Sequence, residues 1–301
     1  MPDKGKAHLL KSFRMVLPAA AILIAGVVVL LGLLIYRVSH PEPSPEPVNP
    51  THYSLPALEV SIPAGGENRL PAWWIPGLKG APGIILAPGY GMSRSDAMSL
   101  AAALHEKGYN ILVYSQRGCG PAPASASTLG LREAGDMAQA VRLIQDRPEG
   151  DRARLGIWGV DIGALAALRT AASFPEVLAI VADSPYESES DFFACLLADD
   201  FGLGSRILSS ICYQAFRLTQ VFNGSLSSRK LPVKELSGRA ILFIKGENRK
   251  NLAELTNAIY DQIQPQKEMI SFKAARVRAM SGEELMAYDR QVANFFSLNL
   301  R

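Results

Sequence analysis

Histidine is scarce in this sequence, and it is confined to the first 105 of the 301 residues. The four histidines are His8, His40, His52 and His105, so none follows residue 105. A histidine is the usual general base of a catalytic triad. A triad whose base comes late in the chain is therefore excluded.

Cysteine is almost as rare, with only Cys119, Cys195 and Cys212. Three cysteines cannot form a dense disulfide framework, and an odd number leaves at least one free thiol. Their spacing matches no common metal motif. Cys195 and Cys212 could form a disulfide in an oxidising compartment, but two buried thiols are the favoured interpretation.

Charge is also modest, because charged residues make up 20% of the chain and the net charge is only +3. No Lys/Arg-rich run with interleaved aromatic residues is present, which argues against a nucleic-acid partner. We therefore expect no nucleic acid, no metal and no cofactor.

Residues 15–36 form a run of 22 residues without a charge. As a helix the run would be roughly 33 Å long, enough to cross a hydrocarbon core of about 30 Å. It is too long for the apolar part of a signal peptide, and no small-x-small cleavage site follows Tyr36. The pattern predicts an uncleaved, single-pass anchor in the cell membrane.

The flanking charges predict the orientation of this anchor. Only Arg37 follows the run directly, whereas the preceding tail has one acidic residue, Asp3, and four basic residues: Lys4, Lys6, Lys11 and Arg14. The positive-inside rule then makes residues 1–14 a cytoplasmic tail and places the main domain outside the cytoplasm.

Residues 37–54 form a linker in which positions 40–50 hold five prolines. Proline-rich segments are extended and semi-rigid. We expect this linker to act as a stalk that holds the domain off the bilayer.

Residues 55–301 show strands that alternate with helices, which predicts one α/β domain with a mostly parallel, doubly wound sheet. Strands are expected at 58–62, 70–75, 83–87, 110–114, 155–158, 177–182 and 240–244, and helices at 97–107, 132–147, 162–173 and 283–296. The long interval at about 187–235 predicts a helical cap, with helices at 190–199 and 205–221, above the carboxyl ends of the strands.

The segment Gly159-Val160-Asp161-Ile162-Gly163 has the frame of a nucleophile elbow, a tight turn from strand to helix that presents its central residue. Together with the segments at 87–91, 114–120, 182–186 and 244–247, it resembles the α/β-hydrolase superfamily, in particular the serine-aminopeptidase-like and esterase-like branch. The resemblance covers about residues 55–301. It implies an α/β-hydrolase fold, with oxyanion-hole donors at the N–H groups of Tyr90 and Ile162.

The sequence departs from this family at each catalytic position. Asp161 stands where the family has its nucleophilic serine, and Arg249 stands where it usually has the triad acid. Met280 and Ser281 occupy the region of the catalytic histidine. The resemblance therefore implies that the catalytic triad has been lost.

Epoxide hydrolases and haloalkane dehalogenases resemble this chain at the elbow, because they also have aspartate there. Asp161 could form an ester by attacking carbon, but no histidine is available to activate the water that hydrolyses it. Glu283 and Glu284 are alternative bases, although acidic residues that open a helix are usually capping charges.

Asp161 also has a structural interpretation, because a carboxylate at a helix N-terminus is stabilised by the free N–H groups and the helix dipole. The nucleophile position thus carries a negative charge and the acid position a positive one. This change predicts an ion pair of Asp161 with Arg249, or with Lys245 as the rival partner.

Three functions remain open. The favoured one is a membrane-anchored, catalytically degenerate α/β-hydrolase homologue that binds a small molecule or a protein partner outside the cytoplasm. The alternatives are an active hydrolase with an unorthodox site at Asp161, and a structural domain whose pocket is filled. An open pocket over Asp161 would favour binding or catalysis, and a filled one would favour a structural role.

Overall fold

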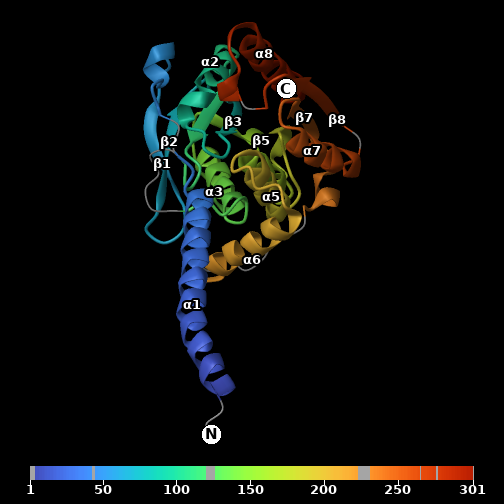
Figure 1. The fold of residues 1–301 in the computed structure, drawn as a ribbon. Coiled ribbons are helices and arrows are strands. Elements are labelled where there is room, and N and C mark those ends of the chain that lie inside the picture. Colours follow the sequence, from blue (N-terminus) through green and yellow to red (C-terminus); the bar gives the residue numbers. More distant parts are fainter. Residues whose placement is uncertain are drawn as a thin grey trace.

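The computed structural model describes residues 4–42, 45–119, 126–222, 231–264, 266–275 and 277–300. Figure 1 shows a long N-terminal helix, α1 (Lys4–Ser39), that projects from an α/β domain. The two parts are in direct contact where α1 ends.

The domain is built on an eight-stranded sheet with the order β1-β2-β4-β3-β5-β6-β7-β8. β2 pairs antiparallel with both β1 and β4, and the pairs from β4 to β8 are all parallel. The strands are β1 (Leu58–Pro63), β2 (Arg69–Ile75), β3 (Ala81–Ala87), β4 (Asn110–Tyr114), β5 (Gly150–Val160), β6 (Val177–Asp183), β7 (Ala240–Gly246) and β8 (Lys267–Phe272). The predicted mostly parallel sheet is confirmed.

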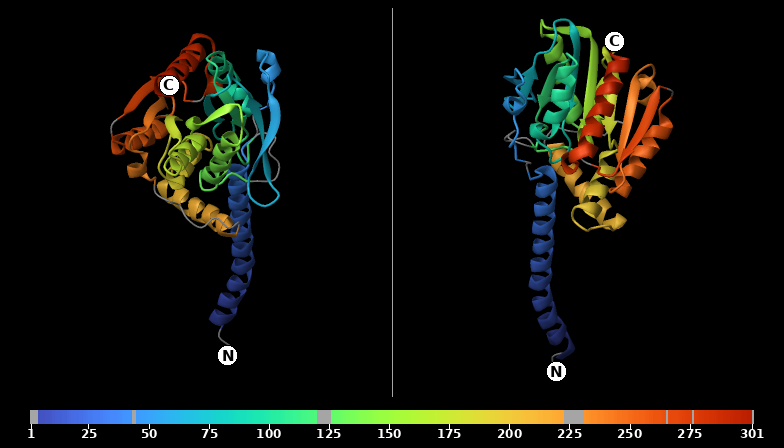
Figure 2. Two further views of the ribbon diagram at one scale, coloured as in Figure 1. Left: turned by 180° about the vertical axis from the view of Figure 1, so that it is seen from behind. Right: turned by 90° about the horizontal axis from the view of Figure 1, so that it is seen from above.

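Helices cover both faces of the sheet, because side chains of a strand alternate between the two faces. On β3, Ile85 and Ala87 join the core under α3 (Glu133–Gln145), α4 (Ile162–Ala171) and α7 (Lys250–Gln262). Ile84 and Leu86 join the opposite core, under α2 (Met98–Glu106) and α8 (Gly282–Asn299). Figure 2 shows these two helical layers from two further sides.

The interval between β6 and β7 contains the two predicted helices, α5 (Glu189–Asp199) and α6 (Arg206–Phe222). The buried side chains of α5 include Phe192 and Phe193. Phe192 stacks on Tyr186, which lies just beyond the carboxyl end of β6. This contact places α5 over the end of the sheet at which the elbow lies.

The apolar stretch of α1 runs from Leu17 to Ser39 and has 23 residues with a mean hydropathy of 2.8. By length and composition it could cross a membrane. Most of its side chains are exposed, but the last turns pack onto the domain. Leu31, Leu34 and Ile35 lie against the core, and Val38 is fully buried.

The proline-rich linker is not a free stalk, so that expectation is wrong. Arg94 holds the linker residue Glu46 through two hydrogen bonds of 3.0 and 2.9 Å and also lies 3.9 Å from the centre of the Trp73 ring. The hydroxyl of Ser95 donates to the backbone carbonyl of Val48. Side chains of the domain thus hold the linker against the surface of the domain. The proline content of the linker alone does not predict these contacts.

The three cysteines Cys119, Cys195 and Cys212 are free thiols, and all three are buried. The interpretation of Cys195 and Cys212 as two buried thiols is therefore confirmed over the disulfide.

Candidate functional site

The elbow has the predicted geometry. β5 ends at Val160, and α4 starts at Ile162, with Asp161 between them at φ 39° and ψ −100°. Such a positive φ is rare for a residue with a side chain and stores strain. A Cβ on Gly159 would lie 2.3 Å from the carbonyl oxygen of Gly163, so the close approach of strand and helix needs glycine.

The Asp161 carboxylate is held by the two amides that were expected to form the oxyanion hole. Its Oδ1 accepts hydrogen bonds from the backbone N–H of Tyr90, at 2.7 Å, and from that of Ile162, at 2.5 Å. The position at the N-terminus of α4 adds the favourable end of the helix dipole. Asp161 therefore supplies its own anion to the oxyanion hole.

The loop after β3 is shaped around this carboxylate. A Cβ on Gly89 would lie only 2.8 Å from each Asp161 carboxylate oxygen, so a side chain at Gly89 would displace it. Two residues on, the N–H of Gly91 donates to the Cys119 sulfur at 3.4 Å. Cys119 thus supports the loop, which explains its burial without a catalytic role.

Aromatic side chains fill the space around the elbow. Asp161 is 1% exposed, Tyr90 is 7% exposed, and Phe192 and Tyr186 are fully buried. Phe192 stacks on Tyr186 at 4.3 Å and meets Tyr90 edge-on at 5.9 Å. Burial and the charge of Asp161 both raise the pKa of Tyr186, so its hydroxyl stays protonated and donates to the Leu129 carbonyl.

The end of α1 contacts the same region. The Tyr90 hydroxyl donates to the Val38 carbonyl at 2.9 Å, and the Ser127 N–H donates to the Ser39 carbonyl at 2.8 Å. Because Tyr90 also holds Asp161 through its backbone N–H, one residue connects α1 to the elbow.

A second buried carboxyl, Asp183, lies at the end of β6, and sequence reasoning gave it no role. Its backbone carbonyl accepts from the Asp161 N–H, and its side chain accepts from the Tyr288 and Ser184 hydroxyls, both at 2.8 Å. The Trp158 indole donates in turn to the Tyr288 oxygen. Burial and, to a lesser extent, the charge of Asp161 raise the pKa of Asp183 to about 7, against the two hydrogen bonds that lower it.

The predicted ion pair of Asp161 is wrong for both proposed partners. Arg249 instead contacts Asp199 at 3.2 Å and Asp200 at 3.3 Å, at the end of α5. Lys245 donates to the Asn257 side chain at 2.9 Å. Both basic side chains thus have acceptors other than Asp161. The spacing of these residues along the chain did not predict those partners.

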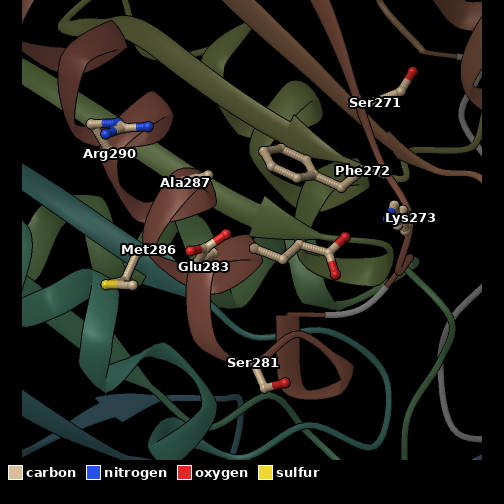
Figure 3. A pocket seen from close by; sticks show the side chains of 9 residues that line it. Ser271, Phe272, Lys273, Ser281, Glu283, Met286, Ala287 and Arg290 are labelled. Atoms are coloured by element: carbon tan, nitrogen blue, oxygen red, sulfur yellow. The ribbon is translucent and has the colours of Figure 1, made fainter.

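The former histidine region does not converge on Asp161 either. Met280 is buried in the core under α2 and α8. Figure 3 shows Ser281 and Glu283 on a surface cleft of about 900 Å³ between β8 and α8. Glu284 also lines this cleft, whereas neither Asp161 nor Tyr90 does.

The residue of this region that does reach the loop after β3 is Arg278, which sequence reasoning missed. Its guanidinium donates to the Gly91 carbonyl at 3.1 Å. The only indication in the sequence was that Arg278 lies in the segment where the family has its catalytic histidine.

Three of the four histidines have other partners. His40 contacts the Tyr36 carbonyl, His52 caps a short helix with Asn49, and His105 contacts the Pro76 carbonyl. His8 lies 31 residues before Ser39 on α1, or roughly 46 Å along the helix. None of the four is placed to activate water at Asp161.

This arrangement restricts the chemistry at the elbow. Acyl transfer needs oxyanion-hole donors that are available to the substrate oxygen, and here Asp161 Oδ1 occupies both. In an attack by the carboxylate on carbon, Oδ2 would react while Oδ1 stayed in the hole. Among the described residues, no group of three His, Cys, Asp or Glu side chains could hold a metal ion.

Comparison with known proteins identifies the fold. A sequence profile of the α/β hydrolase fold matches residues 82–205. An esterase of Pyrococcus furiosus superposes with a TM-score of 0.67 at 21% identity, over 88% of this chain and 99% of the esterase. The chain has the α/β-hydrolase fold, and its resemblance to the α/β-hydrolase superfamily is confirmed.

Two similar sequences extend the comparison. An uncharacterised protein of Mycobacterium tuberculosis is 32% identical over 149 residues, which are 48% of this chain and 52% of that protein. A polyketide transferase of Gibberella fujikuroi is 26% identical over 187 residues, which are 61% of this chain and 56% of the transferase. The matches thus span about half the length of each relative.

Proposed function

We propose that the protein is a membrane-anchored, catalytically degenerate α/β-hydrolase homologue in which the elbow aspartate stabilises the fold. The observation that carries this proposal is the buried Asp161 carboxylate in its own oxyanion hole. The filled elbow favours a structural role for this position, so a ligand or a protein partner would bind the domain at its surface.

Three features support the loss of catalysis. The aromatic residues Tyr90, Phe192 and Tyr186 fill the space that a substrate would need. The acid position is taken by Arg249, whose partners lie on the cap. The described contacts also bring no histidine to the elbow.

A second candidate is an enzyme that uses Asp161 as a nucleophile, and one observation favours it. With Oδ1 in the oxyanion hole, an ester formed through Oδ2 would keep its carbonyl oxygen on the two amides, where hydrolysis develops negative charge. Burial of Asp161 and the distant histidines argue against this candidate.

The test is a screen of the full chain in detergent micelles against esters, thioesters and amides. Asp161→Asn removes the charge, and Asp146→Asn makes the same change at an exposed aspartate. We expect no turnover by the wild type above that of Asp161→Asn. Turnover by the wild type and Asp146→Asn that Asp161→Asn lacks would overturn the proposal.

We further propose that α1 is a single-pass anchor with a cytoplasmic N-terminus and an extracytoplasmic domain. The apolar stretch of α1 and the basic tail before it support this orientation. The packing of Val38 in the core favours retention of the helix over its removal as a leader. Protease added to intact cells should digest the domain, and a protected domain would contradict the orientation.

A further inference from the structure

The cap helix α6 has one buried face and one exposed apolar face. Ser209, Cys212, Phe216 and Gln220 recur every three or four residues and are buried. The other face exposes four large apolar side chains: Ile207 (76%), Leu208 (38%), Ile211 (58%) and Leu218 (62%). Single exposed apolar residues are ordinary, but a row of them along one helix marks an interaction surface.

Three of these four exposed residues form a narrow stripe. At about 100° per residue, Ile207, Ile211 and Leu218 fall within an arc of roughly 40° on the helix. α6 contains no acidic residue, and its two basic residues, Arg206 and Arg217, are exposed. An apolar stripe with basic flanks is typical of helices that lie in a membrane interface.

α6 lies beside the anchor helix. It packs against α1, and Figures 1 and 2 show it next to α1 where α1 meets the domain. Leu31, Leu34 and Ile35 of α1 pack against the same core that contains Phe216 of α6. The buried face of α6 thus packs beside the last apolar turns of α1, and its exposed stripe lies on the opposite face of the helix.

The depth of this contact follows from the length of α1. If residues 15–36 fill the hydrocarbon core, Leu31 lies about 8 Å inside its outer edge, at 1.5 Å per residue. Amphipathic helices in an interface insert roughly 5–10 Å into the boundary of headgroups and acyl chains. The linker adds no spacer, because Val38 is already buried in the domain. The elements packed on Leu31–Ile35 must therefore reach the bilayer surface.

We propose that α6 is a second membrane contact, which lies in the interface of the leaflet next to the domain. Its apolar stripe inserts among acyl chains, while Arg206 and Arg217 contact anionic headgroups. This proposal rests on the anchor role of α1 in the proposed function. It also implies that the cap, and with it the elbow end of the sheet, faces the membrane.

The test uses the full chain in vesicles of phosphatidylcholine and phosphatidylglycerol that contain spin-labelled acyl chains, which quench a fluorophore on contact. An environment-sensitive fluorophore is placed on Ile211→Cys, Leu218→Cys, Val27→Cys or Met286→Cys, one at a time. Val27 lies in the span of α1, and Met286 is an exposed apolar residue on α8. The parent protein, with its three buried cysteines, is the labelling blank.

We expect the labels at 211 and 218 to be quenched to a similar extent as the label at 27, while the label at 286 is not quenched. Quenching at 27 alone would leave the anchor in place and overturn the role of α6. A blue-shifted but unquenched label at 211 would mean that a second protein copy covers the stripe, which also overturns the proposal. No quenching at 27 would contradict the anchor itself.

Discussion

Asp161 combines a strained backbone with a well-satisfied side chain. Its φ of 39° lies outside the usual regions, yet its carboxylate accepts two short hydrogen bonds at a helix N-terminus. In a hydrolase such strain presents a reactive group. Here the same turn directs the carboxylate into the hole, and Gly89 leaves room for it.

We predict that Asp161→Ala lowers the free energy of unfolding by about 2–4 kcal/mol, because it leaves two buried N–H groups without an acceptor. Asp161→Asn keeps an acceptor oxygen and should cost less, at about 1 kcal/mol. Chemical denaturation of the full chain in micelles measures both, with Asp146→Asn as the control. An alanine variant as stable as the wild type would contradict a structural role.

Asp183 predicts a pH dependence of stability. Its pKa is raised from 3.8 to about 7 in the folded state, so the folded chain binds more protons than the unfolded chain between these values. The stability that Asp183 contributes is thus fully present below about pH 4 and lost as the pH rises through 7, with a slope of at most about 1.4 kcal/mol per pH unit.

Asp183→Asn removes this titration. The free energy of unfolding of the variant, minus that of the wild type, should therefore rise between pH 4 and pH 7 and then level off. Asp136 and Asp289, whose pKa values are raised to about 6, titrate in both proteins and cancel in this difference. A difference that stays flat with pH would contradict a buried, neutral Asp183.

At the scale of elements, one stretch of the domain holds both the end of α1 and the linker. The loop after β3 binds the end of α1 through Tyr90, and the following short helix binds the linker through Arg94 and Ser95. The backbone of the same loop also donates to Asp161 through the Tyr90 N–H. This loop therefore holds both the elbow carboxylate and the end of α1.

We predict that Glu46→Ala lowers the free energy of unfolding by about 1–3 kcal/mol, because the buried Arg94 guanidinium keeps only its Trp73 ring contact and a longer contact to Glu59. Glu42→Ala removes an exposed carboxylate from the same segment and should have no effect. Denaturation of both variants in micelles provides the comparison. Equal stability of the two variants would mean that Glu46 does not hold the linker.

Local patterns predicted most of the elements and the elbow. Buried parallel strands such as β3 are short apolar runs, and the glycines at 159 and 163 fix the turn around Asp161. The edge strand β8 was missed because its residues are partly exposed on both faces and show no alternation.

The contacts of the site were less predictable, because they join distant positions. Arg249 meets Asp199, 50 residues before it, and Tyr288 meets Asp183, 105 residues before it. The linker looked like a spacer because proline composition describes the chain alone and not its contact with Arg94. Long-range side-chain pairs of this kind leave no periodic signal in a sequence.

For the whole molecule, the α/β-hydrolase fold is present, while the positions at which the family has its catalytic residues make contacts within the fold. The strand order and the elbow are retained, but Asp161, Arg249 and Met280 make structural contacts. Fold alone therefore does not establish an activity. We propose that Asp161 is a structural anion and not a nucleophile.

The most direct test is the intact mass of the full chain after incubation with styrene oxide. Attack of a carboxylate oxygen on the epoxide carbon breaks the C–O bond, and the alkoxide takes a proton from water, so the adduct adds the whole mass of the epoxide. Without a histidine to hydrolyse it, such an ester would accumulate. We predict that peptide mapping finds Asp161 unmodified. An adduct at Asp161 that is absent from Asp161→Asn would contradict the account.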